Sequence, residues 1–427
     1  MSDRLIVPSG MSRRHFLGHM ATTTLAVPAM QFFGNMEAHA QQLKRNNKRC
    51  IMLWMGGGPS HMDTWYLKPE SEKNGGEFKP IDTSAPGVQI CEHLPTIAKQ
   101  MKHLSIVRSL NSKEGNHDRG TYMMHTGYQP NPTVVHPSFG SYCSVELGEK
   151  LQNFDLPHFI SINSPSQGAG FLGMSHSPFM VQNPNAPIAN LSPPSGISED
   201  RQGRRLKMLS MVEGNFLNQK RGQAGVDHKA VYYKTVKMMN SHYTRALKLD
   251  DEPKEVRDAY GRGSFGSGCL MARKLVEAGV TFVEVALGGW DNHTDIFNTL
   301  SKGNLPELDK GMGTLVADLD QRGLLDDTLI VWMGEFGRTP RVNQNAGRDH
   351  HPGSWSIVMG GGGLKGGQAI GATDKDGIEI IDKPVGVMDV IATMTKAMGI
   401  PLTTQYTTPL GRPIKIVDDG KPIADLI

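Results

Sequence analysis

The sequence has little cysteine, and what it has is scattered. Its 427 residues include four cysteines, none of them in a Cys-x-x-Cys pair. This spacing excludes a disulfide-rich scaffold and a compact cysteine metal knot. We therefore expect the cysteines to be structural, with room for one disulfide. They are Cys50, Cys91, Cys143 and Cys269.

The sequence also lacks a large excess of charge of one sign and long apolar runs. Lys and Arg number 45 against 42 Asp and Glu, a formal net charge of +3. So small an excess argues against a protein built to capture nucleic acid. No segment approaches the roughly 18 unbroken apolar residues of a transmembrane helix, so we expect no stable membrane span. The length allows one large domain or two ordinary ones.

The N-terminus has the pattern of an export signal. Arg13-Arg14 precedes the mildly apolar stretch 21–30, and Ala38-His39-Ala40 follows as a small-residue cleavage site. These features in this order indicate a twin-arginine signal peptide over residues 1–40. The mature protein would begin near Gln41, have the twin-arginine export machinery as a partner, and work in the periplasm or cell envelope.

Short apolar runs followed by glycines and polar residues recur along the chain. They suit strands covered on both faces, as in a parallel sheet between helices. Other segments repeat apolar residues with a helical period. The alternation predicts an α/β fold for residues 41–427, with a mostly parallel sheet flanked by helices. The apolar runs are 50–55, 280–287, 328–333 and 355–359, and the helical segments are 305–319 and 387–398.

Residues 165–280 break this pattern. Their first part is rich in Gly, Ser and Pro, and helical stretches follow at 205–217 and 228–239. We interpret the segment as a helical and loop insertion that caps the site, where substrate choice could be made.

Acidic residues follow three of the expected strands. Asp63, Asp291 and Glu335 each come after an apolar run and a glycine. In open α/β sheets, sites gather at the carboxyl ends of the strands. Each residue alone is also compatible with an ordinary turn or helix cap. Together they predict one site at this edge.

Histidines lie in the same predicted loops. Asp291 and His293 fall close together, with Asp295 beside them, and His117 lies in another polar loop. Carboxylate oxygen with imidazole nitrogen suits zinc, manganese or iron better than calcium. The adjacent pair His350-His351 offers one more ligand. For 290–295 the alternative is a polar turn that ends a strand.

The order of these motifs resembles the alkaline phosphatase and sulfatase superfamily. The run 326–337, D-D-T-L-I-V-W-M-G-E-F-G, looks like its D-N-T-L-V-V-F-T-S-D-H-G element, and His351-Pro352-Gly353 looks like its closing H-T-G. The resemblance implies an alkaline-phosphatase-like fold and a divalent metal, zinc by preference, with manganese or calcium as alternatives. The implied metal ligands are Asp63, Asp291, His293, Glu335 and His351, with His350 as the substitute for His351.

The sequence is more similar still to the exported, sulfatase-like family called domain of unknown function fifteen-oh-one. The similarity covers about residues 48–427. The phrases that carry it are G-G-G-P-S-H-M-D-T-W, H-T-G-Y, A-R-K-L-V-E-A-G-V, G-G-W-D-N-H, G-E-F-G-R-T-P and G-R-D-H-H-P-G.

Two departures separate the chain from ordinary sulfatases. Glu335-Phe336 stands where the superfamily has Asp-His, so one imidazole ligand is lost while a carboxylate remains. Counting back from Thr126-Gly127 places His117 where sulfatases have the cysteine that matures to formylglycine. His117 is then the catalytic candidate, as a nucleophile, a base or a metal ligand.

These observations predict a metal-dependent hydrolase of phosphate or sulfate esters. Arg338 and Arg348 would hold the anionic ester, with Arg338 near the reaction and His61 also contacting substrate. The substrate would be a small anionic ester or a polysaccharide ester such as a sulfated cell-envelope polymer. The alternative is an exported metal- or ligand-binding protein that kept the fold and lost the reaction.

Overall fold

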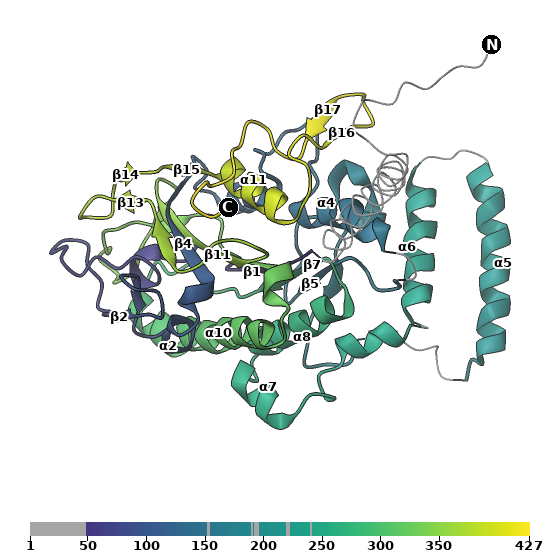
Figure 1. Cartoon of the computed structure of the whole chain (residues 1–427). Coiled ribbons are helices and arrows are strands. Elements are labelled where there is room, and N and C mark those ends of the chain that lie inside the picture. The colour runs from purple at the N-terminus through teal and green to yellow at the C-terminus, as the bar shows by residue number, and fades with distance from the viewer. Residues whose placement is uncertain (1–47, 152–153, 189–190, 192–195, 219–222, 240) are drawn as a thin grey trace, which may run out of the picture. The chain divides into compact units, whose positions relative to one another are not determined.

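The structure is a computed structural model that describes residues 48–427, except 152–153, 189–190, 192–195, 219–222 and 240 (Figure 1). The predicted export signal at 1–40 lies outside the described residues. Among the described helices, none is long and apolar enough to cross a lipid bilayer. All four cysteines are buried free thiols.

A large mixed sheet forms the centre of the fold. Its strand order is β12-β4-β11-β8-β1-β7-β5-β6, and β15 also pairs with β4. Neighbouring strands are parallel except for β11, which is antiparallel to both β4 and β8. The predicted mostly parallel α/β sheet is therefore confirmed. The strands are β1 Arg49–Trp54, β4 Leu104–Asn111, β5 Phe159–Ile162, β6 Phe179–Val181, β7 Phe282–Ala286, β8 Thr328–Met333, β11 Trp355–Gly361, β12 Gln368–Ile370 and β15 Val385–Gly386.

Helices cover both faces of the sheet. Alternate residues of a strand point to opposite sides, and in the central strands the residues on both sides are apolar and need to be buried. Ile51 and Leu53 of β1 belong to a core shared with α8 and α10, whereas Cys50 and Met52 pack in a core shared with α4 and α11 (Figure 1). The two helices expected from periodicity are confirmed as α10 and α11. The covering helices are α3 His117–Thr126, α4 Phe139–Glu146, α8 Ser264–Ala278, α10 Leu305–Gln321 and α11 Val387–Ala397.

The segment 165–280 contains a helical hairpin. The two helical stretches expected there are present as α5 and α6, which contact each other, while α8 packs on β7. That this segment caps the site stays a prediction. Besides α8, the α-helices of this segment are α5 Glu199–Asn218, α6 Gln223–Met239 and α7 Lys254–Tyr260.

Short elements complete the fold at the surface and in the loops. They are β2 Pro80–Asp82, β3 Gln89–Cys91, β9 Gly337–Arg338, β10 His350–His351, β13 Ala372–Thr373, β14 Ile380–Asp382, β16 Gln405–Thr407, β17 Pro413–Lys415, α2 Pro95–Ala98 and α9 Ile296–Thr299.

The reversed direction of β11 determines which loops meet. The parallel strands β1, β4, β7 and β8 end at one edge of the sheet, and the antiparallel β11 begins there. The loops that follow the four strands therefore lie beside the loop that precedes β11. These loops carry the polar residues considered next.

Candidate metal centre

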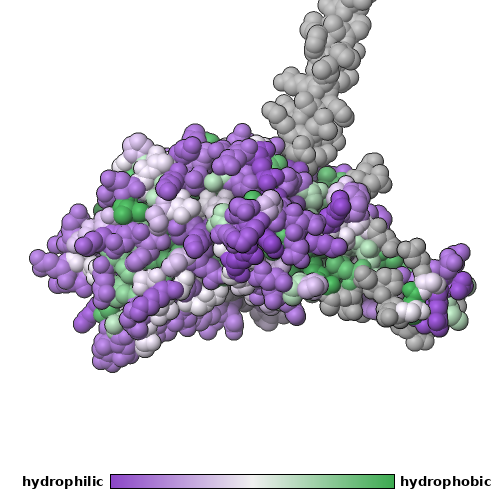
Figure 2. Space-filling view, turned by 90° about the horizontal axis from the view of Figure 1, so that it is seen from below, coloured by the Kyte–Doolittle hydropathy of each residue, from purple (hydrophilic) through white to green (hydrophobic). Residues whose placement is uncertain are grey.

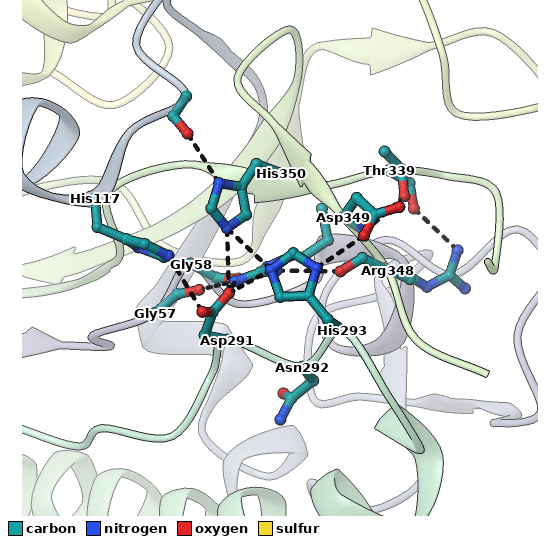
Figure 3. A network of polar contacts seen from close by, with 12 residues as sticks. Gly57, Gly58, His117, Asp291, Asn292, His293, Thr339, Arg348, Asp349 and His350 are labelled. Atoms are coloured by element: carbon teal, nitrogen blue, oxygen red, sulfur yellow. Dashed lines mark hydrogen bonds and ion pairs between the residues drawn. The ribbon is translucent and has the colours of Figure 1, made fainter. Parts of the chain in front are cut away.

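Asp291, just after β7, lies at the centre of three histidines (Figure 3). Its Oδ1 is 3.0 Å from His293 Nε2 and 3.2 Å from His350 Nε2. Its Oδ2 is 3.4 Å from His117 Nε2. The Nε2 atoms of His293 and His350 are themselves 3.2 Å apart. One carboxylate and three imidazole nitrogens thus converge from three segments of the chain: the loop after β7, the start of α3 and β10.

The outer nitrogen of each ring has an acceptor of its own. His117 Nδ1 lies 2.7 Å from Glu335 Oε1, and His293 Nδ1 lies 2.8 Å from Asp349 Oδ1. His350 Nδ1 lies 2.9 Å from the carbonyl oxygen of Gly115. Since these oxygens can only accept, each neutral ring carries its proton on Nδ1 and turns the Nε2 lone pair toward Asp291. Metal-ligating histidines are held in this way.

The strand β10 decides between the two adjacent histidines. Neighbouring residues of a strand point to opposite sides, so only one imidazole of the pair can face Asp291. It is His350, which pairs with Arg338 of β9. In the part of the chain that is described, His351 Nε2 is buried without a hydrogen-bond partner, and burial lowers the pKa of His351.

Local backbone features place the ligands. His117 opens α3, whose first turn is capped by Asn116, with its Oδ1 accepting from Arg119 N at 3.2 Å. A Cβ on Gly57, whose φ is +117°, would lie 2.5 Å from the backbone nitrogen of Asp291. Only glycine tolerates both the conformation and the contact at this position.

Arg338 contacts the centre from the protein interior. Its side chain is 0% exposed. Nε donates to Gly58 O at 2.8 Å and Nη1 to Arg348 O at 3.1 Å, while Nη2 donates to Gly57 O and to Asp291 Oδ1. All its nitrogens are used inside the protein. The structure therefore places this arginine against Asp291, with its donors engaged inside the protein, and its predicted contact with substrate stays a prediction.

Asp291 is held ionised. Burial by itself would raise the pKa of Asp291, but the hydrogen bond and charge of Arg338, helped by His350 and His117, outweigh burial and lower that pKa to about 2. The side chains of Asp291, His293, His117 and His350 are 45%, 43%, 36% and 27% exposed. The centre is thus negatively charged at its middle and open to solvent.

Asp63 and Arg348 bind each other instead of joining this group. Arg348 Nε lies 2.7 Å from Asp63 Oδ2 and Nη2 lies 3.0 Å from Asp63 Oδ1, and both side chains are 0% exposed. Ser60 Oγ donates to Asp63 Oδ2 at 2.6 Å. The carboxylate is fully satisfied by these partners. The structure does not bring it to Asp291.

Only part of the predicted set of site residues therefore meets at one place. Asp291, His293, His350 and His117 come together, and the ligand atoms of three of them (His117, Asp291 and His350) lie within 4.8 Å of one another. Glu335 orients His117 and accepts from Gly57 N at 2.9 Å. Among the described residues, no hydrogen bond or ion pair joins this group to the side chains of the other predicted residues, which are Asp63, His61, His351 and Arg348.

Two groups that orient the histidines, Asp349 and the carbonyl of Gly115, were not predicted from the sequence. Asp349 stands between Arg348 and His350 in the motif, so its position next to a candidate ligand was a usable signal. The carbonyl of Gly115 gave none, because every residue has a carbonyl.

His61 is buried in a neutral form. It is 1% exposed, and neither ring nitrogen has a hydrogen-bond partner among the described residues. Burial, followed by the charges of His351, Arg348 and Lys68, lowers the pKa of His61 to about 3. A neutral, enclosed ring cannot attract an anion by charge.

Acid should destabilise the protein partly through His61. Its pKa is near 6.5 in an unfolded chain and about 3 when folded. Unfolding therefore takes up a proton between these values, so this part of the stability is complete above about pH 6.5 and is lost as the pH falls toward about 3. His61→Phe, which keeps the ring volume, is expected to flatten the decline of Tm between about pH 7 and 4. His228→Phe, at a ring 73% exposed, is the control. Identical slopes for all three proteins would contradict this assignment.

A family model described as "Protein of unknown function (DUF1501)" matches residues 47–427. The chain belongs to the DUF1501 family. The family predicted from the sequence motifs is thereby confirmed. A comparison with curated proteins found no match.

Solved structures similar to this DUF1501 chain include three enzymes, each at low identity. The lipoteichoic acid synthase LtaP from Listeria monocytogenes is 10% identical, with a TM-score of 0.40 and coverage of 89% of this chain and 76% of that one. The PsFucS1 sulfatase from Pseudoalteromonas sp. is 13% identical, with a TM-score of 0.38 and coverage of 87% and 72%. The phosphonate monoester hydrolase SpPMH from Silicibacter pomeroyi is 11% identical, with a TM-score of 0.34 and coverage of 88% and 76%.

Proposed function

We propose that the protein is a metal-dependent hydrolase of phosphate or sulfate esters that works outside the cytoplasm. The observation that carries the proposal is the convergence of three imidazole Nε2 atoms on Asp291, each ring fixed through its Nδ1. Three imidazoles and one carboxylate fit zinc well and fit calcium poorly. The export part rests on the Arg13-Arg14 pattern.

The centre would bind the metal through Asp291, His293 and His350, with His117 as a fourth ligand or as the base. A divalent cation held there supplies a Lewis acid for an anionic ester. His117 is the residue best placed to move a proton, because Glu335 holds its Nδ1–H at 2.7 Å and leaves Nε2 basic. Glu335 is 2% exposed, which keeps this orientation free of competing water.

A binding protein without hydrolytic activity is the second candidate. The observation in its favour is that Arg338 and Arg348 are both 0% exposed with their donors engaged inside the protein. Neither guanidinium is then free to hold a phosphate or sulfate group. The same metal centre would remain, with a ligand bound and released unchanged.

Metal analysis followed by an ester screen tests both candidates. The purified protein is expected to contain one stoichiometric metal. After this metal is stripped, zinc at about 100 times its Kd should stabilise the metal-free protein by about 2.7 kcal/mol. Hydrolysis of aryl phosphate and aryl sulfate esters should then depend on that metal, with His117→Ala as the inactive comparison and His228→Ala as the matched surface control.

The results of these two measurements distinguish the hydrolase from the binding protein. Metal without hydrolysis of either ester favours the binding protein. If the protein holds no stoichiometric metal, and zinc and manganese leave its Tm unchanged, both candidates are wrong.

A further inference from the structure

Helix α5 presents an outward face that no other described element covers. Among the described residues, α5 contacts α6, and α6 in turn contacts the short helix Met174–His176 and the helix His242–Leu247 (Figure 1). Lys234 Nζ of α6 donates to the carbonyl of Ser175 at 2.9 Å, so α6 is the anchored member of the hairpin.

The outward face has a regular composition. Its residues follow helical spacing along about two-thirds of α5, with arginines in the first half and large apolar residues in the second. Met208, Met211 and Val212 are 68%, 67% and 61% exposed, on a surface that Figure 2 shows to be mostly hydrophilic. We name this face the α5 stripe. It consists of Arg201, Arg204, Arg205, Met208, Met211 and Val212.

The positive charge of the stripe is unbalanced. None of its three arginines forms an ion pair with a described carboxylate, and all three are exposed. The nearest acidic residue in the apolar half, Glu213, is mostly buried at 14% exposure and faces His228 of α6 at 3.8 Å. The exposed Asp200 adjoins these arginines in the first turn of α5, but no ion pair joins it to them, so three positive charges face one negative charge. The stripe therefore combines unpaired guanidinium groups with exposed apolar side chains.

A second copy of the chain does not fit this face. In a symmetric pair, each stripe would meet another stripe, so six arginines would be desolvated with only the Asp200 of each copy as a described neighbouring carboxylate. Burying unpaired charge is strongly unfavourable. The occupant must therefore bring negative charge.

We propose that the α5 stripe docks the protein on an anionic phospholipid surface. Guanidinium groups pair in a planar, bidentate way with phosphate oxygens, and basic residues near a charged bilayer bind it electrostatically. The methionines and Val212 enter the interface between headgroups and acyl chains, as on other amphipathic helices that lie on a membrane. A protein partner with an acidic groove is the competing occupant, and a failure of the wild-type protein to bind vesicles would favour it. The proposal does not depend on the metal centre.

Vesicle co-sedimentation of the full chain tests this docking. Wild-type protein is expected to bind phosphatidylglycerol-containing vesicles and to bind phosphatidylcholine vesicles far more weakly. Replacing all three stripe arginines by Gln should lower partitioning on the order of a hundredfold. Replacing Met208, Met211 and Val212 by Ser, at unchanged charge, should lower it roughly tenfold. Every variant keeps the same N-terminal segment, so its contribution cancels.

A charge-matched control tests whether the overall positive charge of the protein, and not the stripe, accounts for vesicle binding. Lys302, Lys375 and Lys396 are exposed, and in the described structure no ion pair involves them. Their joint replacement by Gln removes the same charge and should leave partitioning nearly unchanged. Equal losses in the two triple variants, no binding of wild-type protein, or a wild-type dimer that the arginine variant dissociates would each overturn the proposal. Unchanged Tm values show that the variants are folded.

Discussion

Asp291→Asn is expected to remove stoichiometric metal and to lower any metal-dependent ester hydrolysis by more than about a hundredfold. Asp291 is the only residue that contacts all three converging imidazoles in the described structure. Asparagine keeps the shape and can still accept from Arg338, but it loses the negative charge that a divalent cation needs. The measurements are metal content of the purified variant and its rate with aryl phosphate and sulfate esters.

Asp295→Asn is the matched control for this change. Asp295 follows Asp291 by four positions, and its Oδ1 accepts only a local bond from Asn298 Nδ2 at 3.0 Å. It caps the short helix α9, and in the described structure no hydrogen bond or ion pair joins its side chain to the three histidines. The control should retain metal and rate. Equal metal content in both variants would return Asp291 to a structural role and leave the centre without its main support.

The sheet could be predicted from the sequence because its strands are buried on both faces. Runs such as 328–333 contain no polar residue beyond their first position, and a parallel sheet between helices is the usual place for such runs. The direction of β11 could not be predicted, because an apolar run does not record which way it lies. The direction of β11 does not disturb the site, since an antiparallel strand begins at the edge of the sheet where the parallel strands end.

The ligand set was predictable only in part. The sequence shows that His350 and His351 share a loop, but the phase of a two-residue strand depends on its pairing with Arg338 in β9. The arginines presented a similar ambiguity. Arginine beside a polar motif fits substrate binding in a sequence, whereas the fold buries Arg348 against Asp63. Long-range pairing of this kind, between residues 285 positions apart, leaves no local signal.

Arg348→Met is expected to lower the free energy of unfolding by about 3–5 kcal/mol, because it leaves the fully buried Asp63 carboxylate without its cation. Such a loss is a large part of the usual total stability. Urea denaturation at neutral pH measures it. Lys237→Met is the control, because this lysine pairs with Asp155 at the surface and should change stability by less than about 1 kcal/mol.

The double variant Asp63→Leu/Arg348→Met decides between two roles for Asp63. If the pair is structural, removing both charges should give a protein more stable than Arg348→Met alone, with metal content unchanged, since the uncompensated carboxylate is gone. Recovery will be partial, because Arg348 Nη1 also donates to the carbonyl of Thr339 at 3.2 Å. If Asp63 instead ligates metal, as the superfamily resemblance implies, the double variant should lose metal even though it regains stability. Metal content and unfolding free energy are measured on the same preparations. Together they distinguish an Asp63 that only forms a buried ion pair from an Asp63 that leaves Arg348 to bind the metal.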